Sequence, residues 1–230
     1  MRNEHLRRTG VGCALLAAVL TALVVAGWRP LLSYDDQVAR DLHAHAVAHP
    51  GVTGLMRVLS DWVWDPWTMR ALAALACVWL WRRGERERSV RVALATVVAS
   101  AVQQGVKAVT DRERPVWPDP VDSANYAAYP SGHAMTAAVV CGLLLWLLPR
   151  PAARQPERPA SPRRSAWAVR SAWAVAAVSV LGVGFTRVYL GVHWMSDVFA
   201  GWLLGVALVA LATSGAGLPQ RARSIARCGR

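Results

Sequence analysis

Long apolar stretches alternate with short polar and charged stretches along the whole chain. Six stretches consist mainly of Ala, Val, Leu and Trp. Their lengths approach the roughly 20 residues that a helix needs to cross a bilayer. These stretches are 11–28, 67–81, 92–109, 131–148, 172–185 and 198–213. The pattern therefore predicts an all-α, polytopic membrane protein with six transmembrane helices.

The segment between the first two apolar stretches, 29–65, has a different pattern. Tyr34, Val38 and Leu42 recur every four residues, with charged side chains between them. Residues four apart share one face of a helix, so the segment predicts an additional amphipathic helix at the membrane interface. The segment also contains three histidines, His43, His45 and His49. Because no Cys or carboxylate completes a usual ligand set, a solvated helix face is preferred for them over a metal cluster.

Composition supports the membrane assignment and narrows the range of partners. Hydrophobic residues make up 54% of the chain and its mean hydropathy is +0.27, which is too apolar for an ordinary soluble domain. The formal net charge is +12, but the arginines form short blocks, and no basic face alternates with stacking aromatics. Nucleic acid is therefore not an expected partner. The cysteines are Cys13, Cys77, Cys141 and Cys228. They lack metal-ligand or disulfide spacing and are interpreted as small core residues.

The charge of the connecting segments predicts how the helices are oriented. Arginine is concentrated in every second connection, whereas the others balance arginine with Asp and Glu. The arginine-rich segments are the N-terminus, 82–91, 150–170 and the tail, and the balanced segments are 29–65, 110–130 and 186–197. Because basic connections stay in the cytoplasm, both termini are expected to be cytoplasmic and the balanced connections extracytoplasmic. A cleaved signal peptide at 11–28 is disfavoured, because this stretch is long and no clear small-residue cleavage site follows it.

The chain is expected to form one membrane domain, 1–215, followed by a basic cytoplasmic tail, 216–230. Residues 149–170 are rich in Pro and Arg without an apolar period, which predicts a flexible loop. The small pair Gly201 and Gly205 indicates a close approach between two helices.

Three groups of polar residues lie on the predicted extracytoplasmic side. They are Lys107 with Arg114 and Pro115, Pro130-Ser131-Gly132-His133, and Arg187 with His193 and Asp197. Ionisable groups at the mouths of membrane segments are costly and point to function by default. Because the orientation was derived without these residues, their convergence on one face is independent support for a shared site.

The cationic and helix-start residues suit an anion, and a phosphoryl group in particular. Lys107, Arg114 and Arg187 can surround its oxygens, since Arg offers a planar fork and Lys a point charge. Ser131 and Gly132 open a helix whose backbone N–H groups and dipole attract anions. Snorkelling side chains and an ordinary helix start are the plainer interpretations. However, Lys107 is the only lysine among the 26 Lys and Arg residues, which favours a specific role.

The two histidines suit acid and nucleophilic chemistry. His193 and Asp197 are four residues apart, so on one helical turn the carboxylate can fix the imidazole and leave its other nitrogen free to attack phosphorus. His133, at the start of another helix, can donate a proton to the leaving oxygen. Cations and backbone donors can stabilise such a transfer without a metal or other cofactor.

The three motifs together resemble the signature of the type 2 phosphatidic acid phosphatase superfamily, also called lipid phosphate phosphatases. The resemblance covers roughly residues 60–213. It implies a six-helix membrane core, metal-independent dephosphorylation through a phosphohistidine on His193, and His133 as general acid. It also implies an active site on the extracytoplasmic face of the plasma membrane. The family's third motif usually begins Ser-Arg, whereas this chain has Thr186-Arg187; because Thr keeps the hydroxyl, phosphate binding is expected to survive.

The expected function is hydrolysis of a lipid phosphate or diphosphate, such as undecaprenyl diphosphate, phosphatidylglycerophosphate or phosphatidic acid. A lipid phosphotransferase that uses the same histidine and a catalytically inert lipid-phosphate binding protein are the alternatives. A vanadium-dependent haloperoxidase shares the constellation, but those enzymes are soluble. The motifs do not choose the lipid or the oligomeric state, because both depend on surfaces that motif spacing does not describe.

Overall fold

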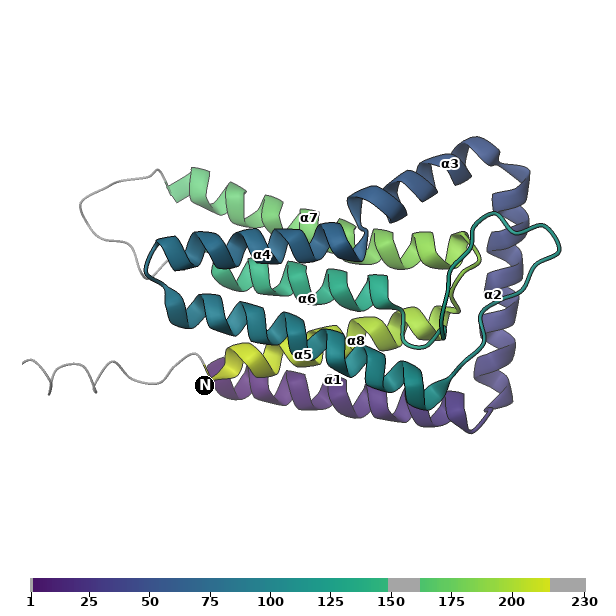
Figure 1. Ribbon diagram of the computed structural model, residues 1–230, viewed down its shortest axis with the longest axis horizontal. Coiled ribbons are helices and arrows are strands. Elements are labelled where there is room, and N and C mark those ends of the chain that lie inside the picture. Colours follow the sequence, from purple (N-terminus) through teal and green to yellow (C-terminus); the bar gives the residue numbers. More distant parts are fainter. Residues whose placement is uncertain (1, 149–161, 216–230) are drawn as a thin grey trace, which may run out of the picture.

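The computed structural model describes residues 2–148 and 162–215, and within these ranges the chain forms helices and loops without strands (Figure 1). Six helices run alongside one another in a bundle. They are α1 (Arg2–Val25), α4 (Pro66–Arg82), α5 (Arg86–Thr110), α6 (Gly132–Leu147), α7 (Pro162–Tyr189) and α8 (Met195–Ser214). Each contains the apolar stretch predicted at that position, except that α1 ends at Val25, three residues before the predicted end, and α6 is one residue shorter at each end. The predicted tail, 216–230, and most of the predicted loop after α6 lie outside the described residues.

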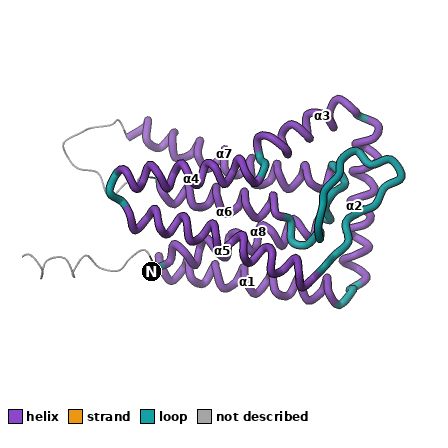
Figure 2. Tube along the Cα trace, viewed as in Figure 1, coloured by secondary structure: helices purple, strands orange, loops and turns teal. Residues whose placement is uncertain are grey.

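Three shorter elements connect α1 to α4 at one end of the bundle. Helix α2 (Arg29–Ala48) lies across that end, and α3 (Pro50–Val58) and the π-helical turn η1 (Leu59–Val63) lead back into the bundle (Figure 1). Helices α5 and α7 finish at this end and α6 and α8 begin there, next to the loop 111–131 (Figure 2). We call it the site end. The N-terminus of α1 and the turn between α4 and α5 lie at the opposite end.

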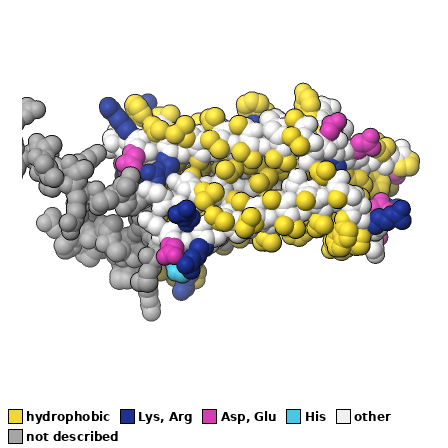
Figure 3. Space-filling model, turned by 90° about the horizontal axis from the view of Figure 1, so that it is seen from below, with side chains coloured by type: hydrophobic (Ala, Val, Ile, Leu, Met, Phe, Trp, Pro, Cys, Tyr) yellow, Lys and Arg dark blue, Asp and Glu magenta, His cyan; other side chains and the backbone are white. Residues whose placement is uncertain are grey.

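The flanks of the bundle are apolar, as expected for a protein in a bilayer. Four helices are long and apolar enough to cross a membrane, namely Asn3–Val25, Arg86–Thr110, Ala166–Tyr189 and Met195–Ser214. Helix α6 is apolar but has only 16 residues, and α4 has 17. Hydrophobic side chains cover the visible flank, while most of the charged ones gather at its two ends (Figure 3). Leu15, Leu75 and Val97 are each more than 60% exposed, which fits contact with lipid better than with water.

Helix α6 forms the centre of the bundle and packs against α4, α5, α7 and α8. The predicted small pair lies where α8 crosses it. A Cβ atom on Gly201 would lie 2.7 Å from the Ser131 carbonyl oxygen, and one on Gly205 would lie 2.7 Å from the Ala138 Cβ. Only glycine fits this approach, which confirms the interpretation of the pair. It brings the starts of α6 and α8 together, and the Ser131 N–H donates to the Asp197 carbonyl oxygen at 2.9 Å.

The structure corrects the predicted boundary of the fifth helix. Helix α7 begins at Pro162, so residues 162–170 are helical and do not belong to the predicted loop. Proline is tolerated in a first helical turn, because the N–H group that it lacks would have no intrahelical partner there. Because this segment is rich in arginine, the apolar pattern placed the start of the helix ten residues later, at 172.

The structure also corrects the predicted faces of α2. Of the predicted apolar face, Val38 and Leu42 are partly buried and pack against a core cluster, whereas Tyr34 is 55% exposed. The buried residues of α2 are Asp35, Ala39, His43 and Ala46. The interpretation of His43 as solvated is wrong, because its ring stacks on Trp117 with 4.0 Å between centroids. Its Nε2 lies 3.3 Å from an Asp119 carboxylate oxygen. The reason is that α2 lies against polar loops and helix ends, so that polar side chains can be buried on its inner face.

Candidate active site

All three predicted motifs reach the site end of the bundle and several of their side chains meet. The Arg114 Nη1 lies 3.2 Å from the Nε2 of His193. Arg114 and Lys107 both donate to the Ala127 carbonyl oxygen, which places the lysine beside the same loop. Helix α5 thus supplies the lysine, the following loop supplies the arginine, and the connection from α7 to α8 supplies the histidine.

The predicted pair of His193 and Asp197 is present, but the two residues do not share a helical turn, because His193 lies in the connection before α8 and only Asp197 lies on the helix. The His193 Nδ1 lies 3.1 Å from the Asp197 Oδ2, which also accepts the Trp194 N–H at 2.9 Å. A guanidinium has only donors, so a hydrogen bond from Arg114 to the His193 Nε2 requires the tautomer whose ring hydrogen lies on Nδ1, beside Asp197. The Asp197 carboxylate therefore holds the tautomer that leaves the Nε2 lone pair available.

The surroundings of His193 also keep its ring neutral. The side chain is 2% exposed, and burial lowers its pKa well below the ordinary value of 6.5. The charges of Arg114, Arg187 and Lys107 lower this pKa further. A neutral imidazole with a free lone pair, facing cations that can hold an anion, has the properties of a nucleophile.

Arg114 is held by the backbone of the loop and of the α7–α8 connection. Its Nε donates to the Tyr126 carbonyl oxygen at 2.9 Å, its Nη2 to that of Asn125 at 3.0 Å, and its Nη1 to that of Val192 at 2.5 Å. Burial, followed by the charge of Arg187, lowers the Arg114 pKa to about 10. The guanidinium therefore stays charged at neutral pH, and its position is fixed before a ligand arrives.

Arg187, near the end of α7, is 4% exposed and belongs to the same site. Its Nη1 donates to the Ser60 Oγ at 2.7 Å and lies 3.7 Å and 3.8 Å from carboxylate oxygens of Asp61 and Asp122. Its Nε is buried without a hydrogen-bond partner, so one donor remains for a ligand. The neighbouring Thr186 hydroxyl donates to the Val183 carbonyl oxygen at 2.8 Å and thus turns toward its own helix.

The predicted helix-start residues open α6 at the same end. The Ser131 side chain is fully buried, yet its Oγ has no hydrogen-bond partner and is free for a ligand. A Cβ atom on Gly132 would lie 2.6 Å from the Gln103 Nε2, so the close contact with α5 requires glycine there. His133 follows in the first turn, where Arg114, Arg187 and His193 lie within electrostatic range of its ring.

Two further residues, Arg112 and Asp35, belong to the site and were not predicted. The Arg112 Nη1 donates to the Asp197 Oδ1 at 2.6 Å and to the Ser196 Oγ at 2.7 Å. Its Nη2 donates to the Asp35 Oδ2 at 2.8 Å, and the Asp35 Oδ1 accepts the Ser196 N–H at 2.9 Å. One oxygen of Asp197 therefore holds His193, and the other is held by Arg112, which is itself anchored to α2.

Sequence offered a signal for only one of these residues. Arg112 lies between Lys107 and Arg114 in the first motif, so its place in that motif could have raised it as a candidate. Asp35 lies 161 positions before its partner Ser196, and the helical pattern placed it on the polar face of α2. Its role depends on how α2 crosses the bundle end, which no local pattern encodes.

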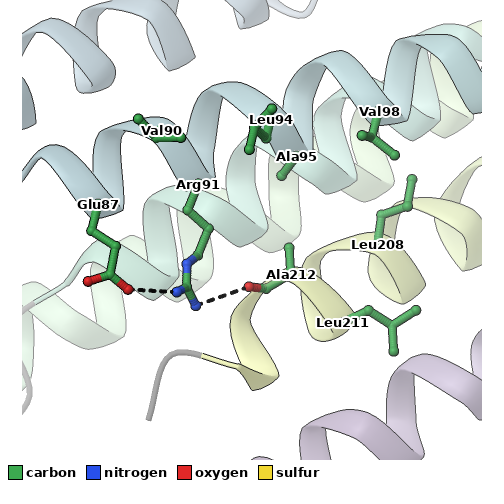
Figure 4. Close-up of a pocket in the computed structure, with 9 residues that line it drawn as sticks. All are labelled: Glu87, Val90, Arg91, Leu94, Ala95, Val98, Leu208, Leu211 and Ala212. Carbon is green, nitrogen blue, oxygen red and sulfur yellow. Dashed lines mark hydrogen bonds and ion pairs between the residues drawn. The ribbon is translucent and has the colours of Figure 1, made fainter. Parts of the chain in front are cut away.

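An apolar pocket of about 470 Å³ lies elsewhere, between α5 and α8 toward the opposite end (Figure 4). Arg91 lines it and is already partnered, since it donates to a Glu87 carboxylate oxygen at 2.9 Å and to the Ala212 carbonyl oxygen at 3.4 Å. The pocket contains no residue of the three motifs, so it is separate from the candidate active site.

Comparisons with known proteins find two relatives that are phosphatases. An undecaprenyl-diphosphatase of Sulfolobus acidocaldarius is 29% identical over 167 residues, which are 67% of this chain and 66% of that protein. Phosphatidylglycerophosphatase B of Bacillus subtilis is 32% identical over 98 residues, 43% of each chain. The alignments thus span less than two thirds of either relative's length.

A solved structure shares the fold. The crystal structure of a transmembrane PAP2 type phosphatidylglycerolphosphate phosphatase from Bacillus subtilis superposes with a TM-score of 0.73. The match covers 96% of this chain and 98% of that one, at 19% sequence identity. The family model described as PAP2 superfamily matches residues 88–217, more than half of the chain, and includes all three motifs. The resemblance inferred from the motifs is confirmed, and the chain belongs to the PAP2 superfamily.

Proposed function

We propose that this protein is an integral membrane phosphatase that hydrolyses a lipid phosphate or diphosphate through a phosphohistidine on His193, without a metal. The observation that carries the proposal is the state of this residue. Its ring is buried, Asp197 holds the Nδ1 hydrogen, and Nε2 faces the Arg114 guanidinium. An anion drawn to that cation arrives in front of a prepared nucleophile. The relatives named above, a lipid diphosphatase and a lipid phosphatase, support this class of substrate.

The reaction proceeds in two balanced steps. In the first, the His193 Nε2 lone pair forms a bond to phosphorus and the bond from phosphorus to the lipid oxygen breaks. His133, which holds a proton once the negative charge of the bound substrate offsets the nearby cations, gives that proton to the lipid oxygen. In the second, water attacks the phosphohistidine and passes a proton to His133, and the bond from Nε2 to phosphorus breaks. Inorganic phosphate is released, and both histidines return to their starting states.

The other site residues stabilise the charge that develops in these steps. Lys107, Arg114 and Arg187 contact the equatorial oxygens of the phosphoryl group, with one donor of Arg187 already free. The unpartnered Ser131 hydroxyl and the N–H groups that begin α6 provide neutral donors.

We further propose that all six bundle helices cross the plasma membrane, with both termini in the cytoplasm and the site end outside. The arginine-rich N-terminus and the 82–91 connection support this orientation, because both lie at the end opposite the site. A cysteine at exposed Ser123, in a background without the native cysteines, should react with an impermeant maleimide in intact cells. Labelling only after the cells are opened would contradict the orientation.

Phosphate release from purified protein tests the proposed function. The substrates are undecaprenyl diphosphate, phosphatidylglycerophosphate and phosphatidic acid, each in detergent with excess EDTA. We expect release by the wild type, loss of release in His193→Ala, and near wild-type release in His49→Ala, which removes an exposed histidine outside the site. Absence of phosphate release from every substrate, or equal activity of His193→Ala and wild type, would refute the proposal.

A further inference from the structure

Arg70 of α4 is a membrane-helix arginine that the site described above does not use. Its Nε is buried and has no hydrogen-bond partner. Arg112 and Arg187, whose side chains are 12% and 4% exposed, form ion pairs in the site, whereas the partly buried Arg70 forms none among the described residues. The guanidinium carbon of Arg70 lies 5.3 Å from the ring centroid of Trp67, an exposed side chain. An arginine without a carboxylate partner is costly in a membrane helix, which indicates a ligand.

The position of Arg70 relates it to His133. Together with Gln103 of α5 and Thr136 of α6, it lines a space of about 10 Å³ whose other walls are mainly apolar. The space holds one water molecule, and therefore also one oxygen of a phosphate. Gln103 packs on Gly132, and Thr136 is one helical turn beyond His133. Arg70 lies within electrostatic range of the His133 ring. The arginine therefore lies on the His133 side of the site, beside residues that follow His133 on α6.

This is the position that the leaving side of a lipid substrate would occupy. In an in-line displacement the leaving oxygen lies opposite the nucleophile, so it is on the side of His133, away from His193. A lipid arrives with its tail in the bilayer, so its leaving side lies deeper than the phosphoryl group that is transferred. The three cations Lys107, Arg114 and Arg187 surround that phosphoryl group, whereas Arg70 faces what remains on the lipid.

We propose that Arg70 binds the second, lipid-proximal phosphate of a lipid diphosphate and makes diphosphates the preferred substrates of this site. The inference rests on the proposed phosphatase function. When the bridging bond from phosphorus to oxygen breaks, the terminal phosphoryl group stays on His193, and the lipid monophosphate leaves with the His133 proton. Negative charge develops on the departing phosphate as that bond breaks and before the proton is fully transferred, and a guanidinium donating to the free oxygens of this phosphate compensates it.

The three substrate classes differ in what they present to Arg70. A polyprenyl diphosphate places a phosphate directly beyond the bridging oxygen. Phosphatidylglycerophosphate also has a second phosphate, but a glycerol unit separates it from the scissile phosphate. Phosphatidic acid has none. Arg70 should therefore increase the hydrolysis rate most for the first, less for the second and least for the third.

The test compares kcat/KM of full-length wild type, Arg70→Gln, Arg70→Lys and Arg91→Gln on these three substrates. Arg91 is a matched control, because it also lies on a membrane helix but is partnered at the far end. We expect Arg70→Gln to lose about 10- to 100-fold on the diphosphate, the range expected for one hydrogen-bonded charge, and less than about threefold on phosphatidic acid. Arg70→Lys should fall between Arg70→Gln and wild type on the diphosphate, and Arg91→Gln should match wild type.

The two proposals can fail separately. An unchanged ratio of diphosphate to phosphatidic acid hydrolysis in Arg70→Gln, with the wild type active on both, overturns the second-phosphate site and leaves the phosphatase proposal standing. An equal loss of kcat/KM on all three substrates in both Arg70 variants also overturns the second-phosphate site. A wild type that releases no phosphate from any of the three overturns the proposed function, and the Arg70 inference with it.

Discussion

The two ends of the helix bundle use charged residues in opposite ways. At the site end, Asp197, Asp35 and Arg187 are at most 4% exposed and bond across elements that are far apart in the chain. At the opposite end, the pairs join neighbours on one helix, as between Arg88 and Glu85 or between Arg91 and Glu87, whose side chain is 81% exposed.

The difference shows which charges this fold keeps for chemistry. Exposed pairs three or four residues apart stabilise a helix only slightly, because water and salt screen them. Buried charges are costly to desolvate and are tolerated only when each partner is satisfied. A network such as Arg112 with Asp35 and Asp197 is therefore a weak source of stability but fixes the geometry of the side chains it joins. Substitutions at the two ends should have very different effects.

The largest effect is expected from Asp197→Asn. The amide keeps the shape of the carboxylate, but it no longer stabilises the Nδ1–H tautomer of His193, so Nε2 loses its lone pair. We expect kcat to fall by about 10³- to 10⁴-fold with KM little changed, as for other catalytic histidines that lose their carboxylate. Steady-state kinetics checks this. A loss that appears only in KM would show that the residue serves binding and not catalysis.

A smaller loss is expected when the support of Asp197 is removed. Arg112→Gln and Asp35→Asn each break one link between α2 and the carboxylate, and we expect about 10- to 100-fold lower kcat in each. Because both links belong to one network, the double variant should lose less than the product of the single losses. Kinetics of the double-mutant cycle measures this coupling.

The control for this cycle is the pair formed by Arg40 and Asp36. It lies on the same helix, but its side chains are largely exposed, and each of its substitutions should leave kcat within about twofold. If Arg112→Lys keeps the kcat that Arg112→Gln loses, a positive charge at this position is sufficient to support Asp197. Equal losses at the exposed and buried pairs would contradict the distinction drawn between them.

The pH dependence of activity sharpens the comparison further. Burial and three cations lower the His193 pKa, so its ring remains neutral as pH falls through the ordinary value of 6.5. The acid limb of kcat/KM should therefore lie below pH 6.5. Replacing Arg114 by Gln removes one of these cations, which should raise the His193 pKa and move the acid limb to higher pH.

Rate profiles of wild type and Arg114→Gln check this shift, with the phosphate pKa of the substrate measured separately. A wild-type acid limb centred at or above 6.5, and unmoved by the substitution, would show that another group controls it.

The smallest effect is expected at the opposite end. Glu87→Gln removes an exposed partner of Arg91 and leaves its bond to the Ala212 carbonyl oxygen. We expect kcat within about twofold of wild type and a melting temperature within about 2 °C, because the pair is screened by solvent. Thermal unfolding in detergent and phosphate release measure both quantities. A loss comparable with that of Arg112→Gln would mean that charges at this end also support the site.

The sequence by itself determined what depends on near neighbours. The apolar stretches located all six bundle helices, because each helix needs apolar side chains along its length, either on the flanks of the bundle or, for α6, at its centre. The motif named His193 and Asp197 as a pair, although the bend before α8, and not a shared helical turn, brings them together. The glycines of α8 indicated the close approach to α6. The three motifs also named the cations that gather around the histidine.

Only the tertiary structure decided which further residues join the site and which polar groups are buried. Asp35 faces inward because α2 lies across the bundle end, and its bonds to Ser196 and Arg112 span gaps of 161 and 77 residues. His43 is buried for the same reason, against Trp117 of the loop. A helical pattern gives the spacing of residues on a face but not what that face meets. The neighbours of each face are set only when distant elements pack, because each buried charge then needs a partner.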